Sequence, residues 1–228
     1  MVLSAGATDS PGADDALERL CQIYWYPLYS FVRRKGYSTA EAEDLTQGFF
    51  VCFLEKRYLK SVERERGKFR TFLLCSLSHY LANEWDKTQR QKRGGGAKHL
   101  PLGGLEAEKR FVHESDGPPG LKPEEAFDRQ WAETLLALAL ERTREGFERG
   151  GKQERFDVLK SFLLGEPEAG EYAAAAVRLQ LSHQGVKSAV HRLRGRFREI
   201  IREEIGRTVS SRADVDEELR YLIRLMTA

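Results

Sequence analysis

The sequence of 228 residues has little that would place it in a membrane or outside the cell. No stretch approaches the roughly 18 consecutive apolar residues that mark a membrane-spanning helix. Residues 1–11 are small and polar, without the basic and apolar regions of a signal peptide. We therefore expect a cytoplasmic protein without a membrane partner, and 41% of apolar residues is enough for packed cores.

Cysteines and catalytic motifs are also scarce. Three widely spaced cysteines, Cys21, Cys52 and Cys75, lie within apolar patterns, so we expect buried thiols and no disulfide framework. The chain has no glycine-rich phosphate loop, no nucleophile motif and no cluster of metal ligands. His183 and His191 are too far apart on a helix to share a metal ion. These absences predict no catalytic residue, no cofactor and no metal site.

Apolar residues recur at intervals of three and four along most of the chain, which predicts an all-α protein. We expect helices at about residues 14–34, 39–53, 68–92, 124–138 and 153–164, a pair of helices within 171–205, and a last helix after residue 212. Ser38 and Glu41 have the spacing of a capping box at a helix start. No stretch alternates between polar and apolar residues as a strand does.

Residues 94–123 interrupt this pattern with three consecutive glycines, a proline pair and little apolar periodicity. We therefore predict two small helical domains joined by a flexible linker, with a C-terminal helical extension. The predicted domains are residues 14–93 and 124–209, the linker is 94–123 and the extension is 210–228. The apolar face of the extension is expected to include Leu222, Ile223 and Met226.

The charges are segregated, although the net charge is only +2. Residues 87–98 contain five lysines and arginines and no acidic residue. Residues 183–198 also contain five lysines and arginines and no acidic residue. Two separate basic segments predict two contacts with a polyanion. Two solvated helix faces are the alternative interpretation.

Residues 172–198 have the layout of a helix-turn-helix: a helix of small residues, a turn of three residues, and a basic helix. Ser182 is expected to cap the second helix, and Val186 and Val190 to face inward. Such a helix fits the major groove of DNA, although helical hairpins with a basic face also occur in structural domains. The residues expected at the DNA are Ser182, Gln184, Lys187, Ser188, His191, Arg192 and Arg194.

The first basic segment combines an aromatic and an amide side chain with a basic tail. This mixture suits unpaired bases, because a ring can stack on a base while cations hold the backbone. The residues concerned are Asn83, Trp85, Lys87, Arg90, Lys92 and Arg93. In the alternative interpretation, Trp85 belongs to a core and the tail is a solvated helix end.

Residues 41–50 are acidic and aromatic, so this helix would not bind nucleic acid. Phe49 and Phe50 are adjacent and cannot both point at one core from one side of a helix. Either one of them contacts a protein partner, or the helix is packed on two sides.

The order of these elements resembles the extracytoplasmic-function (ECF) sigma factors of the sigma-70 family. Asp44, Leu45, Gln47 and Phe50 match the family motif Asp-Leu-x-Gln-x-x-Phe. In the family this motif lies on the helix that docks on the clamp coiled coil of the largest polymerase subunit. Residues 68–86 are similar to the segment that melts and reads the minus-ten promoter element. Residues 172–198 are similar to the module that recognises the minus-thirty-five element.

The resemblance implies a sigma factor that binds core RNA polymerase and directs promoter recognition, with a region 2-like first domain and a region 4-like second domain. Its partners would be core polymerase and promoter DNA, and an anti-sigma factor, a kinase or the C-terminal helix could hold it inactive. One departure is the alanine run at 173–176, where the family commonly has Glu-Ile-Ala. The extension after residue 212 lies outside the usual minimum of the family.

Three other functions stay open. The first is a stand-alone helix-turn-helix transcriptional regulator that binds duplex DNA as a dimer without core polymerase. The second is an enzyme acting on nucleic acid, which requires clustered carboxylates or a cofactor loop that the sequence lacks. The third is an adaptor that has kept the fold but lost promoter recognition.

Overall fold

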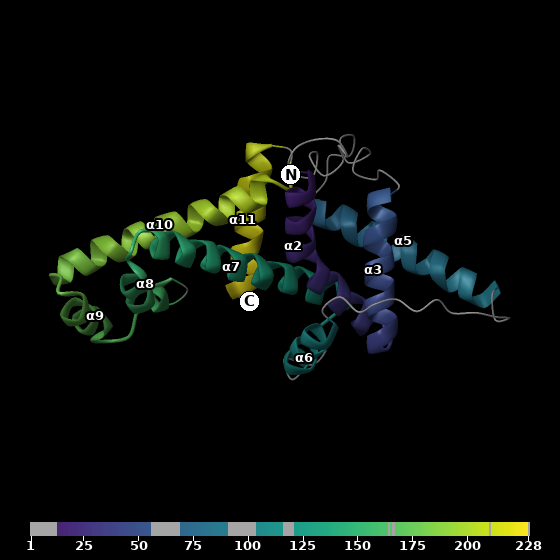
Figure 1. Ribbon diagram of the computed structural model, residues 1–228, viewed down its shortest axis with the longest axis horizontal. Coiled ribbons are helices and arrows are strands. Elements are labelled where there is room, and N and C mark those ends of the chain that lie inside the picture. Colours follow the sequence, from purple (N-terminus) through teal and green to yellow (C-terminus); the bar gives the residue numbers. More distant parts are fainter. Residues whose placement is uncertain are drawn as a thin grey trace.

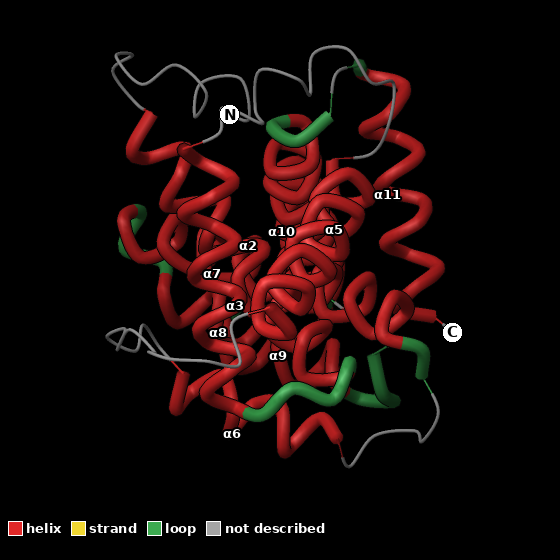
Figure 2. The backbone as a smooth tube through the Cα atoms, turned by 90° about the vertical axis from the view of Figure 1, so that its right-hand side faces the viewer, coloured by secondary structure: helices red, strands yellow, loops and turns green. Residues whose placement is uncertain are grey.

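The computed structural model describes residues 13–55, 69–90, 104–115, 121–163, 165, 167–209 and 211–227. These ranges contain helices and loops and no strand (Figure 2), which confirms the all-α class. None of the helices in these ranges is both long and apolar enough to cross a bilayer.

The helices follow the expected spans, except that the helix expected at 124–138 runs on to residue 149. Those before residue 120 are α2 (Ala13–Arg34), α3 (Thr39–Glu55), α5 (Phe69–Arg90) and α6 (Gly104–Ser115). Those after it are α7 (Pro123–Arg149), α8 (Gln153–Leu159), the 3-10 turn η2 (Lys160–Phe162), α9 (Glu171–Leu179), α10 (His183–Gly206) and α11 (Arg212–Thr227). Helix α6 corrects one expectation, because it lies inside the segment predicted to be a flexible linker. The glycine triplet and the proline pair on either side of it hid this helix in the sequence, and packing on α2 and α3 supports it.

Local sequence signals set several helix ends. The backbone N–H of Ser38 donates to Glu41 Oε2 at 2.9 Å, and the N–H of Glu41 donates to Ser38 Oγ at 3.4 Å. This is the predicted capping box at the start of α3. The N–H of Gly185 donates to Ser182 Oγ at 3.0 Å, which confirms the predicted cap of α10.

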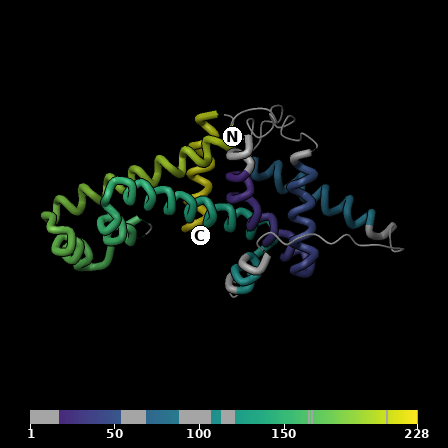
Figure 3. The backbone as a smooth tube through the Cα atoms, in the orientation of Figure 1, coloured from purple at the N-terminus to yellow at the C-terminus, as the bar shows by residue number. Residues whose placement is uncertain are grey.

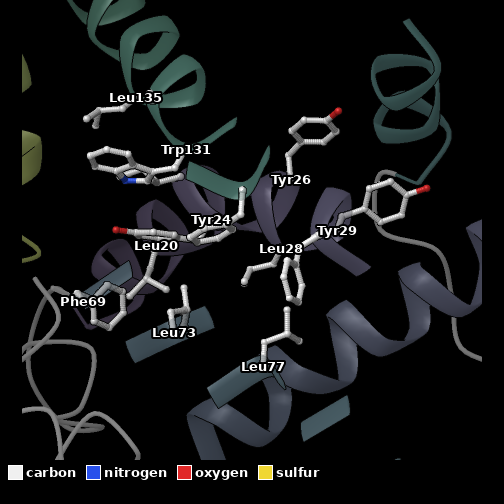
Figure 4. Packing of buried hydrophobic residues seen from close by; sticks show 14 of the residues in the cluster. Leu20, Tyr24, Tyr26, Leu28, Tyr29, Phe69, Leu73, Leu77, Trp131 and Leu135 are labelled. Atoms are coloured by element: carbon white, nitrogen blue, oxygen red, sulfur yellow. The ribbon is translucent and has the colours of Figure 1, made fainter. Parts of the chain in front are cut away.

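The larger of two cores forms around α2. Leu20, Tyr24 and Leu28 of α2 lie between Leu73 of α5 and Trp131 of α7 (Figure 4). The same core extends to α3, to the second half of α10 and to α11. It thus combines residues from both sides of segment 94–123, and the division of the chain into two domains stays a prediction.

The smaller core joins α8, η2, α9 and the first half of α10. Its buried side chains include Phe156, Leu159, Phe162, Val186 and Val190. Helices α7 and α10 are long enough to reach from this core to the larger one. The smaller core therefore lies at one end of the molecule, and α5 extends toward the opposite end (Figures 1 and 3).

The three cysteines carry free thiols. Cys21 and Cys52 are half-buried, but Cys75 is exposed, so the expectation of buried thiols is wrong for Cys75. Leu73 and Leu77 of α5 are buried, and a residue midway between them faces the opposite side of the helix.

A buried carboxylate joins three helices of the larger core. Glu204 of α10 has no exposed surface, and it pairs with Arg142 of α7. Nη1 of Arg19 in α2 lies 3.3 Å from Glu204 Oε1, and Nη1 of Arg207 lies 3.1 Å from the same oxygen. Three guanidinium groups thus compensate one buried charge, as the low dielectric of a core requires.

We expect Glu204→Gln to lower the free energy of unfolding by about 3 kcal/mol, because it leaves arginines at the core without their carboxylate. Urea unfolding measures the loss. The control is Glu203→Gln, whose half-exposed side chain pairs with Arg142 at 3.1 Å and should cost less than about 1 kcal/mol. Equal losses in the two variants would contradict the assigned role of Glu204.

Candidate nucleic-acid interface

The first half of α10 lies at one end of the molecule (Figure 1), and it carries an exposed basic face. Val186 and Val190 are buried in the smaller core, as predicted, and they fix which face of α10 is turned outward. Five of the predicted DNA contacts on the outward face are exposed: Ser182, Gln184, Lys187, His191 and Arg192. A sixth, Ser188, is half-buried. Among the described residues, no carboxylate pairs with Lys187 or Arg192. Both cations are therefore open to a phosphate.

Tyr172 of α9 supports the start of α10. Its ring centroid lies 5.6 Å from that of His183 and 5.0 Å from that of Phe162. Lys187 Nζ lies 5.8 Å from the centre of the same ring. Tyr172 is the first residue of the predicted helix-turn-helix. Its position in the sequence did not indicate that its ring would lie beside His183 and Lys187.

Arg194 occupies a different place from its neighbours. We expected it at the DNA, but its Nε donates to the carbonyl of Phe162 at 2.8 Å. Its Nη2 donates to the carbonyl of Gly165 at 3.2 Å. Arg194 thus ties the loop after η2 to α10, and we remove it from the candidate interface.

A second candidate interface lies on α5. Trp85 is 57% exposed, so the alternative interpretation that places it in a core is wrong. Asn83 and Lys87 are exposed as well, and Lys87 Nζ lies 2.6 Å from Glu84 Oε1. Arg90 is the last residue of α5 and its side chain is not described. Lys92 and Arg93 lie outside the described residues.

A pocket of about 510 Å³ lies beside Trp85. It is lined by Lys35, Gly36, Tyr37, Ser78, Leu81, Ala82, Trp85 and Asp86. The volume is in the range of small-molecule sites and exceeds what a single nucleobase needs. Lys35 and Tyr37 were not singled out in the sequence, because they stand in the turn between α2 and α3 and meet α5 only in the folded chain.

Helix α3 presents an acidic residue and buries both of its adjacent aromatic ones. Asp44 is exposed, and Leu45 and Gln47 are half-buried. Phe49 and Phe50 are both buried in the larger core, and α3 packs on α2, α5 and α6. The two-sided packing is therefore correct, and the expectation that Phe50 contacts polymerase has to be corrected: its exposed fraction is 5%.

Gly48 lets α3 and α5 approach each other closely. A Cβ atom at this position would overlap Tyr80 Oη of α5, so the hydroxyl would have to shift. Burial, together with the nearby Glu84 carboxylate, raises the pKa of Tyr80 to about 12. Tyr80 thus stays neutral and lies edge-on to Phe49, with ring centroids 5.8 Å apart.

The described residues contain no group of three histidine, cysteine or acidic side chains placed to hold a metal ion. Comparison of the chain with protein-family models, with curated proteins and with solved structures gives no match.

We expect Gly48→Ala to lower the free energy of unfolding by about 1–3 kcal/mol, because the added methyl group overlaps Tyr80 Oη. Adding Tyr80→Phe should recover most of the loss, since the next nearest atom, Tyr80 Cζ, lies 3.5 Å from the new Cβ. Urea unfolding of the single and double variants measures both effects.

Gly146→Ala is the matched control, because nothing lies within 4 Å of its Cβ position inside α7. It should stabilise the chain by about 0.5–1 kcal/mol through helix propensity. A Gly48→Ala variant as stable as this control would contradict the close approach of α3 and α5.

Proposed function

We propose that the chain is a sigma factor of the extracytoplasmic-function class, which binds core RNA polymerase, recognises a promoter at two elements and catalyses no chemistry. The observation that carries this proposal is the pair of exposed candidate interfaces at opposite ends of one elongated molecule (Figure 1). One end has unpaired cations on a capped helix, which suits a duplex. The other has an exposed tryptophan beside a pocket, which suits an unpaired base.

In this proposal α10 enters the major groove at the minus-thirty-five element. The N-terminal residues of such a helix meet base edges, and the cations that follow meet phosphates. Gln184 and Ser188 are placed for base edges, and Lys187 and Arg192 for phosphates. Arg196 differs from these two cations in having an acidic neighbour on the same helix, since its Nη1 lies 3.4 Å from Glu199 Oε2.

The second half of α5 takes the minus-ten element. An extruded base can stack on Trp85 or enter the pocket beside it, where Ser78 and Asp86 offer polar groups to its edge. Stacking on an aromatic side chain is worth about 1–3 kcal/mol per base, which offsets much of the cost of opening each pair. This stabilises a melted promoter without catalysis.

Helix α3 contacts the polymerase through its solvent-facing side. Asp44 supplies an exposed negative charge, and Leu45 and Gln47 flank it with half-buried surface. Phe50 supports this side from within the core instead of touching the partner. The docking side lies on α3 and the two DNA interfaces lie on α5 and α10, so the chain can bind polymerase and promoter together.

In vitro transcription tests the proposal. Purified chain is added to bacterial core polymerase on a pool of genomic fragments, and start sites are read by sequencing. We expect start sites that share an upstream motif, and we expect Lys187→Ala with Arg192→Ala to abolish them because two phosphate contacts are lost.

Arg196→Ala is the matched control for charge on the same helix, and it should keep most of the transcripts because Arg196 is paired within α10. Trp85→Ala should keep polymerase binding and lose start sites. Absence of start sites, with binding of duplex DNA by the chain alone, would overturn the proposal in favour of the stand-alone regulator.

A further inference from the structure

Helix α11 covers the start of α5. It crosses α7 and α10 (Figure 1), and its inner face reaches Arg70, the second residue of α5. Arg70 is only 5% exposed, which is unusual for an arginine outside a structural ion pair.

Arg70 is enclosed by aromatic rings and carboxylates from two helices. Its guanidinium carbon lies 4.1 Å from the ring centre of Tyr221 in α11 and 5.0 Å from that of Trp131 in α7. Nη1 donates to Glu218 Oε2 of α11 at 3.2 Å, and Nε lies 3.3 Å from Asp128 Oδ1 of α7. Thus α11 supplies one ring and one carboxylate, the two contacts that close the outer side of Arg70.

Helix α11 is attached to the rest of the chain by several polar contacts and by few fully buried apolar ones. Asp216 pairs with Arg202 of α10, and Tyr221 Oη donates to Asp128 Oδ2 at 2.7 Å. Within residues 212–227, Leu222 is the only fully buried apolar side chain, and Val215, Leu219, Tyr221 and Leu225 are half-buried. Ile223 and Met226 are exposed, which corrects the expected apolar face.

Helix α11 also carries its own N-terminal cap. Ser211 N–H donates to Asp214 Oδ2 at 3.1 Å, and Asp214 N–H donates to Ser211 Oγ at 3.2 Å. A helix capped in this way keeps its first turn without help from its neighbours. Because buried ion pairs add little net stability, separation of α11 costs less than opening of the apolar core between α2 and α7.

We propose that α11 is a detachable cover. The Glu218 carboxylate pairs with the Arg70 guanidinium at the position that a nucleic-acid phosphate takes when α11 is released. Carboxylate and phosphate use the same geometry to accept from a guanidinium. Release of α11 removes the Tyr221 ring and the Glu218 carboxylate from Arg70 and so exposes its Nη1 group, while the Asp128 carboxylate stays 3.3 Å from Nε. The proposal deepens the proposed function and rests on it, because the ligand is a single strand of promoter DNA.

The position of Arg70 on α5 fits a strand that also contacts Trp85. The two residues are fifteen apart, which on an α-helix is about 22 Å along the axis and about 60° around it. A strand that stacks on Trp85 can therefore continue along α5 to Arg70. The cover closes the far end of that path when no promoter is bound.

The test compares full-length chains in binding to a labelled single-stranded oligonucleotide of mixed sequence. Glu218→Gln removes the charge that occupies Arg70, and we expect about tenfold tighter binding from one new charge-assisted contact. The salt dependence should become steeper by about one counterion. Adding Arg70→Gln should remove the gain.

Glu217→Gln is the charge-matched control, because Glu217 is exposed on the same helix and should leave the affinity close to that of the unaltered chain. Leu222→Asp is a second variant that loosens α11 through its buried apolar side chain. Amide hydrogen exchange of α11 reports opening in each variant, and α10 serves as the internal reference.

Faster exchange of α11 without tighter binding in either variant would overturn the proposal. Amides of α11 that stay as protected as those of α10 in both variants would also overturn it. These measurements use no polymerase, so failure of the chain to bind core polymerase would contradict the proposed function and leave their outcome unaffected.

Discussion

The packing of α2 against α7 is the contact on which the rest of the structure depends. Tyr24 and Trp131 meet at the centre of the larger core, and α5 closes it from the other side (Figure 4). Because α7 also runs along α10, this contact sets the direction in which α10 points. The orientation of one candidate DNA interface relative to the other therefore follows from apolar burial between two helices that are distant in the sequence.

The charges of the described residues divide into two groups with different physical roles. Arginines at the centre, such as Arg142 and Arg70, pair with buried carboxylates and hold helices together. Cations at the α10 end, such as Lys187 and Arg192, have no acidic partner there and remain open to a polyanion. The small net charge conceals this division. In the proposed cover, Arg70 belongs to the first group while α11 is in place and joins the second when α11 leaves.

The sequence was sufficient for features that depend on neighbours along the chain. The Ser38 and Ser182 caps and the inward valines of α10 follow from local spacing and are confirmed. Most helix spans follow from it as well, but α6 was not expected and α7 runs well beyond residue 138. Features that depend on what packs on the far side of a helix were not accessible. Periodicity could not decide that Phe50 is buried in the larger core, that Arg194 serves a loop, or that Lys35 lines a pocket with Trp85.

Binding to polymerase is tested most directly by titrating the labelled full chain with bacterial core RNA polymerase and measuring fluorescence anisotropy. We expect saturable one-to-one binding that weakens when the exposed Asp44 of α3 is replaced by alanine. No binding to core polymerase, together with a dimer of the chain on duplex DNA, would contradict the account and identify a regulator that acts without polymerase.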